Sequence, residues 1–149
     1  MKLTYSIYYP GGNTTALVNQ LILNHILKKR INDKIMALNP QVEQVGFIDS
    51  KNYRLEMAGG EFCGNATRCA AFYYLNGKPG KVKLKVSGVA KKLLAGISTN
   101  KTVWTEIPFF PNPIAQKLGY TIIKLEGITQ VITNSLPGKL KAKLILKRL

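Results

Sequence analysis

The sequence predicts an α+β domain in which many short strands surround one buried helix and a second helix lies outside. Runs rich in β-branched and aromatic residues recur between turn signals along the whole chain. One segment, residues 69–75, contains no charged residue, which is typical of a buried helix. Residues 19–31 repeat apolar side chains at helical spacing and predict the outer helix.

The length and composition of the chain limit which architectures are possible. The chain has 149 residues, 46% of them hydrophobic and 19% charged, which favours one globular domain with a sizeable core. It has no apolar stretch long enough for a membrane span and no signal-peptide core. Two cysteines do not indicate a disulfide scaffold, so we expect a cytoplasmic location. With a single histidine, the chain offers no tetrahedral ligand set, and we predict no metal.

The charge is strongly positive, with 22 Lys and Arg against 7 Asp and Glu, a net charge of +15. Such a surface attracts nucleic acids and anionic small molecules. No helix-turn-helix, zinc-finger or RNA-binding motif accompanies it. We therefore interpret most lysines as solvated, and a nucleic-acid partner is not favoured.

The first half of the chain alternates strands with the outer helix. Strands are expected at 3–9 and 14–18, joined by the turn Pro10-Gly11-Gly12-Asn13. The helix at 19–31 either ends there or continues to Leu38, where Asn39-Pro40 stops it. Its His25 lies beside the apolar stripe and is interpreted as a surface or a satisfied core residue rather than a catalyst. Strands at 44–49 and 53–57 form a hairpin whose apolar positions are Val45, Phe47, Leu55 and Met57.

The central helix is predicted at 65–75, with Asn65 as its N-cap, and it ends at Asn76-Gly77. We expect it to be buried nearly all round. The alternating segment 81–86 predicts a strand with one wet face, and further strands are expected at 93–97, 102–107, 120–125 and 128–132. Residues 108–113 contain three prolines and predict irregular backbone.

The candidate catalytic and binding residues lie where the predicted central helix begins. Free amide groups and the positive end of the helix dipole favour an anion there, such as a carboxylate. Cys63 would lie at this point, where a thiolate is stabilised and acts as a base or nucleophile. Gly64 would let a ligand approach the backbone. Taken alone, these residues also fit an inert structural cysteine.

Three ordered motifs resemble one enzyme family. Cys63-Gly64-Asn65-x-x-Arg68-Cys69 resembles the first active-site motif of the diaminopimelate epimerase-like enzymes. Residues 10–18 are similar to their N-terminal strand–loop–strand, and residues 43–48 with 57–67 resemble the histidine racemase branch of opine-metallophore biosynthesis. The resemblance runs from about residue 5 to about residue 132 and covers only the first of the family's two lobes.

The resemblance implies a curved, mostly antiparallel sheet around a central helix and an isomerase that inverts an amino acid without a cofactor. Cys63 would be one acid/base of a two-thiol proton transfer at the α-carbon. Gly64 and Asn65 would hold the α-carboxylate, and Asn13 would contact the substrate. For Gln44, a substrate contact and a structural role both stay open, and Arg68 would support the site.

Two departures from the family pattern affect function. The sequence has no second Cys-Gly motif, and Gln130 stands where the family often has an active-site histidine. We therefore divide the chain into an epimerase-type lobe, 1–136, and a basic tail, 137–149, that replaces the second lobe. A second copy in a homodimer or a separately encoded lobe would supply the missing thiol. The alternatives are a non-catalytic relic or binding module of the same fold and, less favoured, a nucleic-acid-binding protein.

Overall fold

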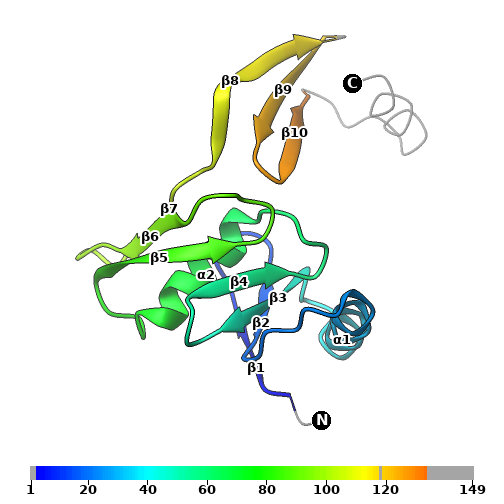
Figure 1. Ribbon diagram of the computed structural model, residues 1–149, viewed down its shortest axis with the longest axis vertical. Helices are drawn as coiled ribbons and strands as arrows, with labels where there is room; N and C mark the ends of the chain where they lie inside the picture. The colour runs from blue at the N-terminus through cyan, green and yellow to red at the C-terminus, as the bar shows by residue number, and fades with distance from the viewer. Residues whose placement is uncertain (1–2, 118, 134–149) are drawn as a thin grey trace.

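The computed structural model describes residues 3–117 and 119–133. A seven-stranded sheet curves around helix α2 (Gly64–Tyr74), which contacts strands from both halves of the sheet. Helix α1 (His25–Leu38) lies outside, against β2 and β3, and a three-stranded sheet stands apart at the other end (Figure 1). The predicted α+β class, one lobe with a curved sheet around a central helix, is confirmed.

The seven strands follow chain order across the sheet. They are β1 (Tyr5–Tyr8), β2 (Thr15–Val18), β3 (Gln44–Asp49), β4 (Arg54–Met57), β5 (Gly80–Val86), β6 (Leu93–Ile97) and β7 (Val103–Thr105). The β2–β3 and β4–β5 pairs are parallel, and the other neighbours are antiparallel. The sheet is therefore mostly antiparallel, as predicted, and β3–β4 is the expected hairpin.

Both faces of β2 and β3 are covered, which explains their continuous apolar sequence. Leu17 and Ile48 point into the core around α2, whereas Val18 and Phe47 belong to a second core beneath α1. The predicted apolar positions of the hairpin are all fully buried. On β5 only one face is covered, and Lys81 and Lys83 are exposed on the other, as its alternation predicts.

Helix α1 begins later than the sequence suggested. The predicted start at residue 19 is wrong, because Asn24 caps the helix through its side chain, which accepts a hydrogen bond from the Leu27 amide at 2.9 Å. The extension to Leu38 is confirmed, and His25 is an exposed first-turn residue. In the described part of the chain, no helix combines the length and apolar character needed to cross a membrane.

Helix α2 also differs in detail from its prediction. It begins at Gly64 with Cys63 as the N-cap, not Asn65, and it ends before Asn76 and Gly77, which have φ of 50° and 69°. Its burial is not complete all round, because Phe72 is exposed.

The second sheet has the order β10-β9-β8, with β8 (Phe109–Lys117), β9 (Tyr120–Leu125) and β10 (Ile128–Ile132). The prediction of irregular backbone at 108–113 is wrong in part. These residues open β8, and the prolines are accommodated by a shift of register between Phe109 and Ile114, with Asn112 at φ 52°. The basic tail, 137–149, lies outside the described residues.

A close contact between two glycines joins the second sheet to the first. Gly88, after β5, and Gly127, in the β9–β10 turn, both have positive φ, and their backbones touch. A Cβ atom on Gly88 would lie 2.7 Å from the Phe62 nitrogen and 3.0 Å from the Gly127 Cα. The Glu126 carboxylate also accepts a hydrogen bond from the Ala90 amide at 2.8 Å. Together these contacts fix the second sheet beside the start of α2.

Replacing Gly88 with alanine should therefore destabilise the protein more than the same change at Gly60. Both residues have positive φ, so each substitution costs roughly 1–2 kcal/mol in backbone strain. Only at Gly88 would the new methyl group meet backbone atoms, which adds about 1–3 kcal/mol for overpacking. Urea unfolding of Gly88→Ala and Gly60→Ala measures the difference, and equal losses would contradict this account of the contact.

Candidate active site

A pocket of about 560 Å³ opens at the N-terminus of α2, between the two sheets. It brings together every residue that the sequence analysis selected as a site residue, namely Asn13, Gln44, Cys63, Gly64 and Asn65. Gln130, the residue found in place of the expected histidine, also lines it. The structure thus gathers these residues, while their roles stay predictions.

Cys63 is held in place by the first turn of α2. Its carbonyl oxygen accepts hydrogen bonds from the Thr67 amide at 3.0 Å and the Thr67 hydroxyl at 2.7 Å. Its Sγ accepts a hydrogen bond from the Ala66 amide at 3.4 Å, as an N-cap side chain does. The thiol is half-buried and faces the pocket. A side chain that caps a helix end in this way is close to the positive end of the helix dipole.

Gln44 is the direct neighbour of the thiol. The Cys63 thiol donates to the Gln44 Oε1 atom, with Sγ and Oε1 3.1 Å apart. The Gln44 Nε2 atom donates to the Thr15 hydroxyl at 2.6 Å and, more weakly, to the Asn13 carbonyl at 3.4 Å. Gln44 therefore contacts the residue of predicted catalytic function and has a structural partner as well, so both alternatives raised for it are compatible with its position.

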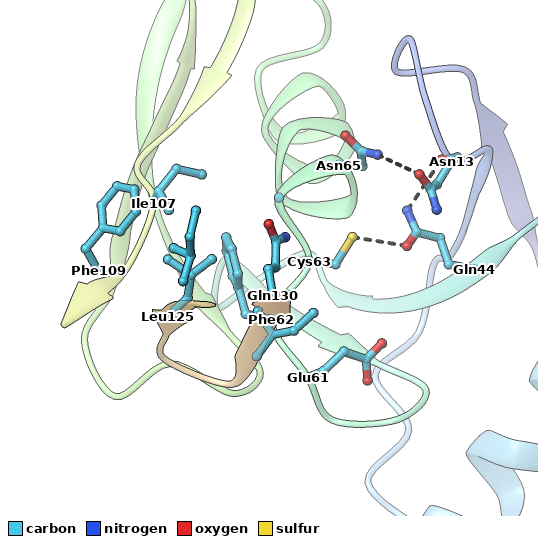
Figure 2. A pocket seen from close by; sticks show the side chains of 13 residues that line it. Asn13, Gln44, Glu61, Phe62, Cys63, Asn65, Ile107, Phe109, Leu125 and Gln130 are labelled. Atoms are coloured by element: carbon cyan, nitrogen blue, oxygen red, sulfur yellow. Dashed lines mark hydrogen bonds between the residues drawn. The ribbon is translucent and has the colours of Figure 1, made fainter. Parts of the chain in front are cut away.

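Asn65 is oriented from two sides. Its Oδ1 accepts a hydrogen bond from Arg68, one turn later in α2, and its Nδ2 donates to the Asn13 Oδ1 at 3.4 Å (Figure 2). Arg68 also donates to the Pro10 carbonyl at 3.1 Å, which ties the 10–13 turn to the helix. Arg68 is not among the residues that line the pocket. Its hydrogen bond to Asn65 is compatible with the supporting role that the sequence analysis expected, which stays a prediction.

The first backbone amides of α2 are available to a ligand. In the described part of the chain, no group accepts a hydrogen bond from the Gly64 or Asn65 amide nitrogen. A Cβ atom at Gly64 would meet only Phe62 and Ile107 side-chain atoms, at 3.8 and 3.9 Å, which is ordinary contact. Packing of the protein itself therefore does not require glycine there, whereas close approach of a ligand to the amide would.

The walls of the pocket differ in character. Figure 2 shows Asn13, Gln44 and Asn65 on one side of Cys63 and apolar side chains on the other. The apolar wall comes from Phe62 and from the second sheet and the segment leading to it, through Ile107, Phe109, Ile123, Leu125 and Ile128. Sequence reasoning missed this wall, because these residues read as ordinary strand residues and only the contact between the sheets brings them to the site.

Glu61 also lines the pocket, but it does not fill the anion site that the sequence predicts at the start of α2. Its carboxylate lies against Gly59, where an added Cβ atom would collide with it. In Figure 2 it points away from Cys63 and Asn65. The Glu61 carboxylate therefore does not occupy the predicted anion site in front of the α2 amides.

Cys69 has a different environment from Cys63. It is a buried free thiol on the far side of the first turns of α2, where it lines a separate cavity with Tyr8, Phe72 and Val103. Burial raises the pKa of Cys69 to about 11, and a contact with the Thr15 hydroxyl offsets part of this rise. Cys69 therefore stays protonated at neutral pH and does not serve the pocket.

A family model described as the histidine racemase CntK N-terminal domain matches residues 2–135. A histidine racemase of Fusobacterium nucleatum is 43% identical over 63 residues, which cover 42% of this chain and 23% of that protein. A histidine racemase of Staphylococcus aureus is 35% identical over 95 residues, which cover 58% of this chain and 35% of that protein. The chain thus matches only part of the length of these relatives.

Limited alkylation should modify Cys63 well before Cys69. At pH 8 a thiol with a pKa of about 11 is about 0.1% thiolate, and Cys69 is also shielded from reagent. Peptide mass spectrometry after brief iodoacetamide treatment measures the two sites separately, with Cys63→Ser and Cys69→Ser as assignment controls. Equal labelling, or labelling of Cys69 first, would show that the environment described for the two thiols is wrong.

Proposed function

The chain belongs to the family of histidine racemase N-terminal domains, and from this premise we propose that it is one lobe of a cofactor-independent amino-acid racemase. The single observation that carries the proposal is the position of Cys63. Its thiol faces a pocket at a helix N-terminus, beside two backbone amides that have no partner in the described residues. An acid/base group and an anion site are thereby adjacent.

The proposed chemistry is a proton transfer at the α-carbon. The Cys63 thiolate takes the α-proton, and the electron pair of the broken C–H bond stays on the substrate as a carbanion delocalised into the carboxylate. A thiol on the opposite face then returns a proton to the α-carbon. In the reverse direction, Cys63 is the thiol that returns the proton. Each turnover exchanges the protonation states of the two groups and leaves the substrate otherwise unchanged.

The α-carboxylate is proposed to bind the Gly64 and Asn65 amides. Backbone donors fixed at a helix N-terminus stabilise negative charge without reorganisation, and this charge increases as the carbanion forms. The Asn65 side chain, held by Arg68 and Asn13, borders the same space. Asn13 and Gln44 would contact the rest of the substrate's polar backbone from the facing wall.

Histidine is the substrate that the relatives suggest, since both carry the name histidine racemase. Its side chain is proposed to lie toward the apolar wall that includes Phe62, Ile107 and Leu125. A planar ring fits such a surface, while the polar wall is occupied by the α-amino and α-carboxylate groups.

A second lobe is proposed to complete the site. Within the described residues, Cys63 is the one cysteine that lines this pocket, and inversion needs a second group on the opposite face of the α-carbon. We propose that a second lobe with its own acid/base group supplies it. A second copy of this chain is the alternative, but a perfect two-fold site would treat an asymmetric substrate symmetrically.

Heavy-water exchange tests the proposed function. The chain incubated with L-histidine in deuterium oxide should incorporate deuterium at the α-carbon without forming D-histidine, because one thiol removes and returns the proton on one face. Cys63→Ser should slow incorporation about a hundredfold or more, the usual contribution of a positioned acid/base group. Cys69→Ser is the matched control and should keep the exchange. NMR follows deuterium content, and chiral chromatography follows inversion.

Two results would contradict the proposal. Exchange at the same rate in Cys63→Ser and the unaltered chain would exclude Cys63 as the base. Absence of exchange, both alone and with a second lobe added, would favour a non-catalytic binding module of the same fold.

A further inference from the structure

Thr15 lies behind Gln44 and Cys63 without lining the pocket. It is fully buried on β2, and its position pairs directly with Gln44 in the parallel β2–β3 ladder. Their side chains consequently leave the sheet side by side, toward α2. The Thr15 hydroxyl accepts from the Gln44 Nε2 at 2.6 Å and donates to the Asn13 carbonyl at 3.0 Å.

This pattern determines which atom of the Gln44 amide faces the thiol. Because the Thr15 proton is used on the Asn13 carbonyl, its oxygen is left to act as an acceptor toward Gln44. The amide nitrogen must then point to Thr15, and Oε1 points to Cys63, where it accepts from the thiol. An acceptor in that place favours the protonated sulfur, whereas the amide N–H₂ would favour the thiolate.

We infer that Thr15 is a positioning residue that, through Gln44, sets the hydrogen-bonding partner of the Cys63 sulfur. The inference rests on the proposed function for its catalytic meaning. With its proton on the Asn13 carbonyl, the Thr15 hydroxyl accepts from the amide N–H₂ and so holds Oε1 against the sulfur, which favours the thiol over the thiolate.

The thiol favoured in this way is the form of Cys63 that returns a proton in the proposed reaction. The charged and titratable groups that border the network are Glu61, from the loop before α2, and Arg68 and Cys69, from α2. The second sheet contributes no titratable side chain to the described pocket lining, since its residues there are Phe109, Ile123, Leu125, Ile128 and Gln130. Gln44 is thus the side chain lining the pocket that hydrogen-bonds the Cys63 sulfur.

Thr15→Val tests the inference, because valine keeps the shape and removes the hydroxyl. Freed from Thr15, the amide can present N–H₂ to sulfur, so alkylation of Cys63 at pH 7 should become about three- to tenfold faster, the effect of one hydrogen bond of ordinary strength. Thr15→Ser should restore the original rate. Cys69 stays buried in all variants, and peptide mapping separates its signal.

A double-mutant comparison decides whether the effect passes through Gln44. In a Gln44→Leu background the sulfur has lost its amide partner, so Thr15→Val should change the alkylation rate no further. A wild-type rate in folded Thr15→Val, or the same acceleration in the Gln44→Leu background, would overturn the inference. Urea unfolding shows whether Thr15→Val folds. If it does not, the alkylation rates of Thr15→Ala and Thr15→Ser are compared instead.

The alkylation readout requires no turnover, so it can fail or succeed independently of the proposed racemase activity. In the heavy-water assay, Thr15→Val should raise the exchange rate at saturating histidine, because more of Cys63 is then the thiolate that takes the α-proton. The half-saturation concentration should stay near the unaltered value, because Thr15 does not line the pocket. Failure of exchange in the unaltered chain, with the alkylation pattern intact, would reject the function and keep the network.

Discussion

The capping of α2 by Cys63 is the constraint on which the rest of the site depends. The carbonyl oxygen of Cys63 accepts two hydrogen bonds from Thr67, and its sulfur accepts one from Ala66. Thr67 and Ala66 are fully buried, in a helix that the seven-stranded sheet encloses. The sulfur is therefore fixed relative to the free amides of the same turn, and moving it would require unwinding a buried helix end.

Two separate structural units supply the chemistry around this point. Strands β2 and β3 bring Thr15 and Gln44 into register behind the sulfur, and the 10–13 turn adds Asn13, so this side is polar. The β8–β10 sheet supplies the apolar side, and the contact between Gly88 and Gly127 holds it there. The pocket thus has one wall suited to an α-amino acid backbone and one suited to an apolar or aromatic side chain.

Much of this arrangement could be predicted from local patterns, and the failures have physical causes. The uncharged run and Asn76-Gly77 locate α2 correctly. The predicted N-cap was Asn65, because asparagine is a commoner N-cap than cysteine. In the structure Cys63 caps the helix, and the Asn65 side chain links Arg68 to Asn13 instead. The apolar residues before Asn24 recur at helical spacing, so the sequence predicted too early a start for α1. The Asn24 side chain caps the helix, which therefore begins after it. Thr15 was missed because only strand pairing places it behind Gln44.

The central claim is that the thiol and the carboxylate-binding amides form one site, and protection of Cys63 tests it most directly. Alkylation of Cys63 is measured with increasing L-histidine and, separately, with histamine, which lacks the carboxylate. A bound carboxylate both covers the sulfur and disfavours its thiolate by like charge. We expect histidine to slow the reaction saturably, with histamine ineffective at the same concentrations. Equal protection by both compounds, or none by histidine, would contradict the account.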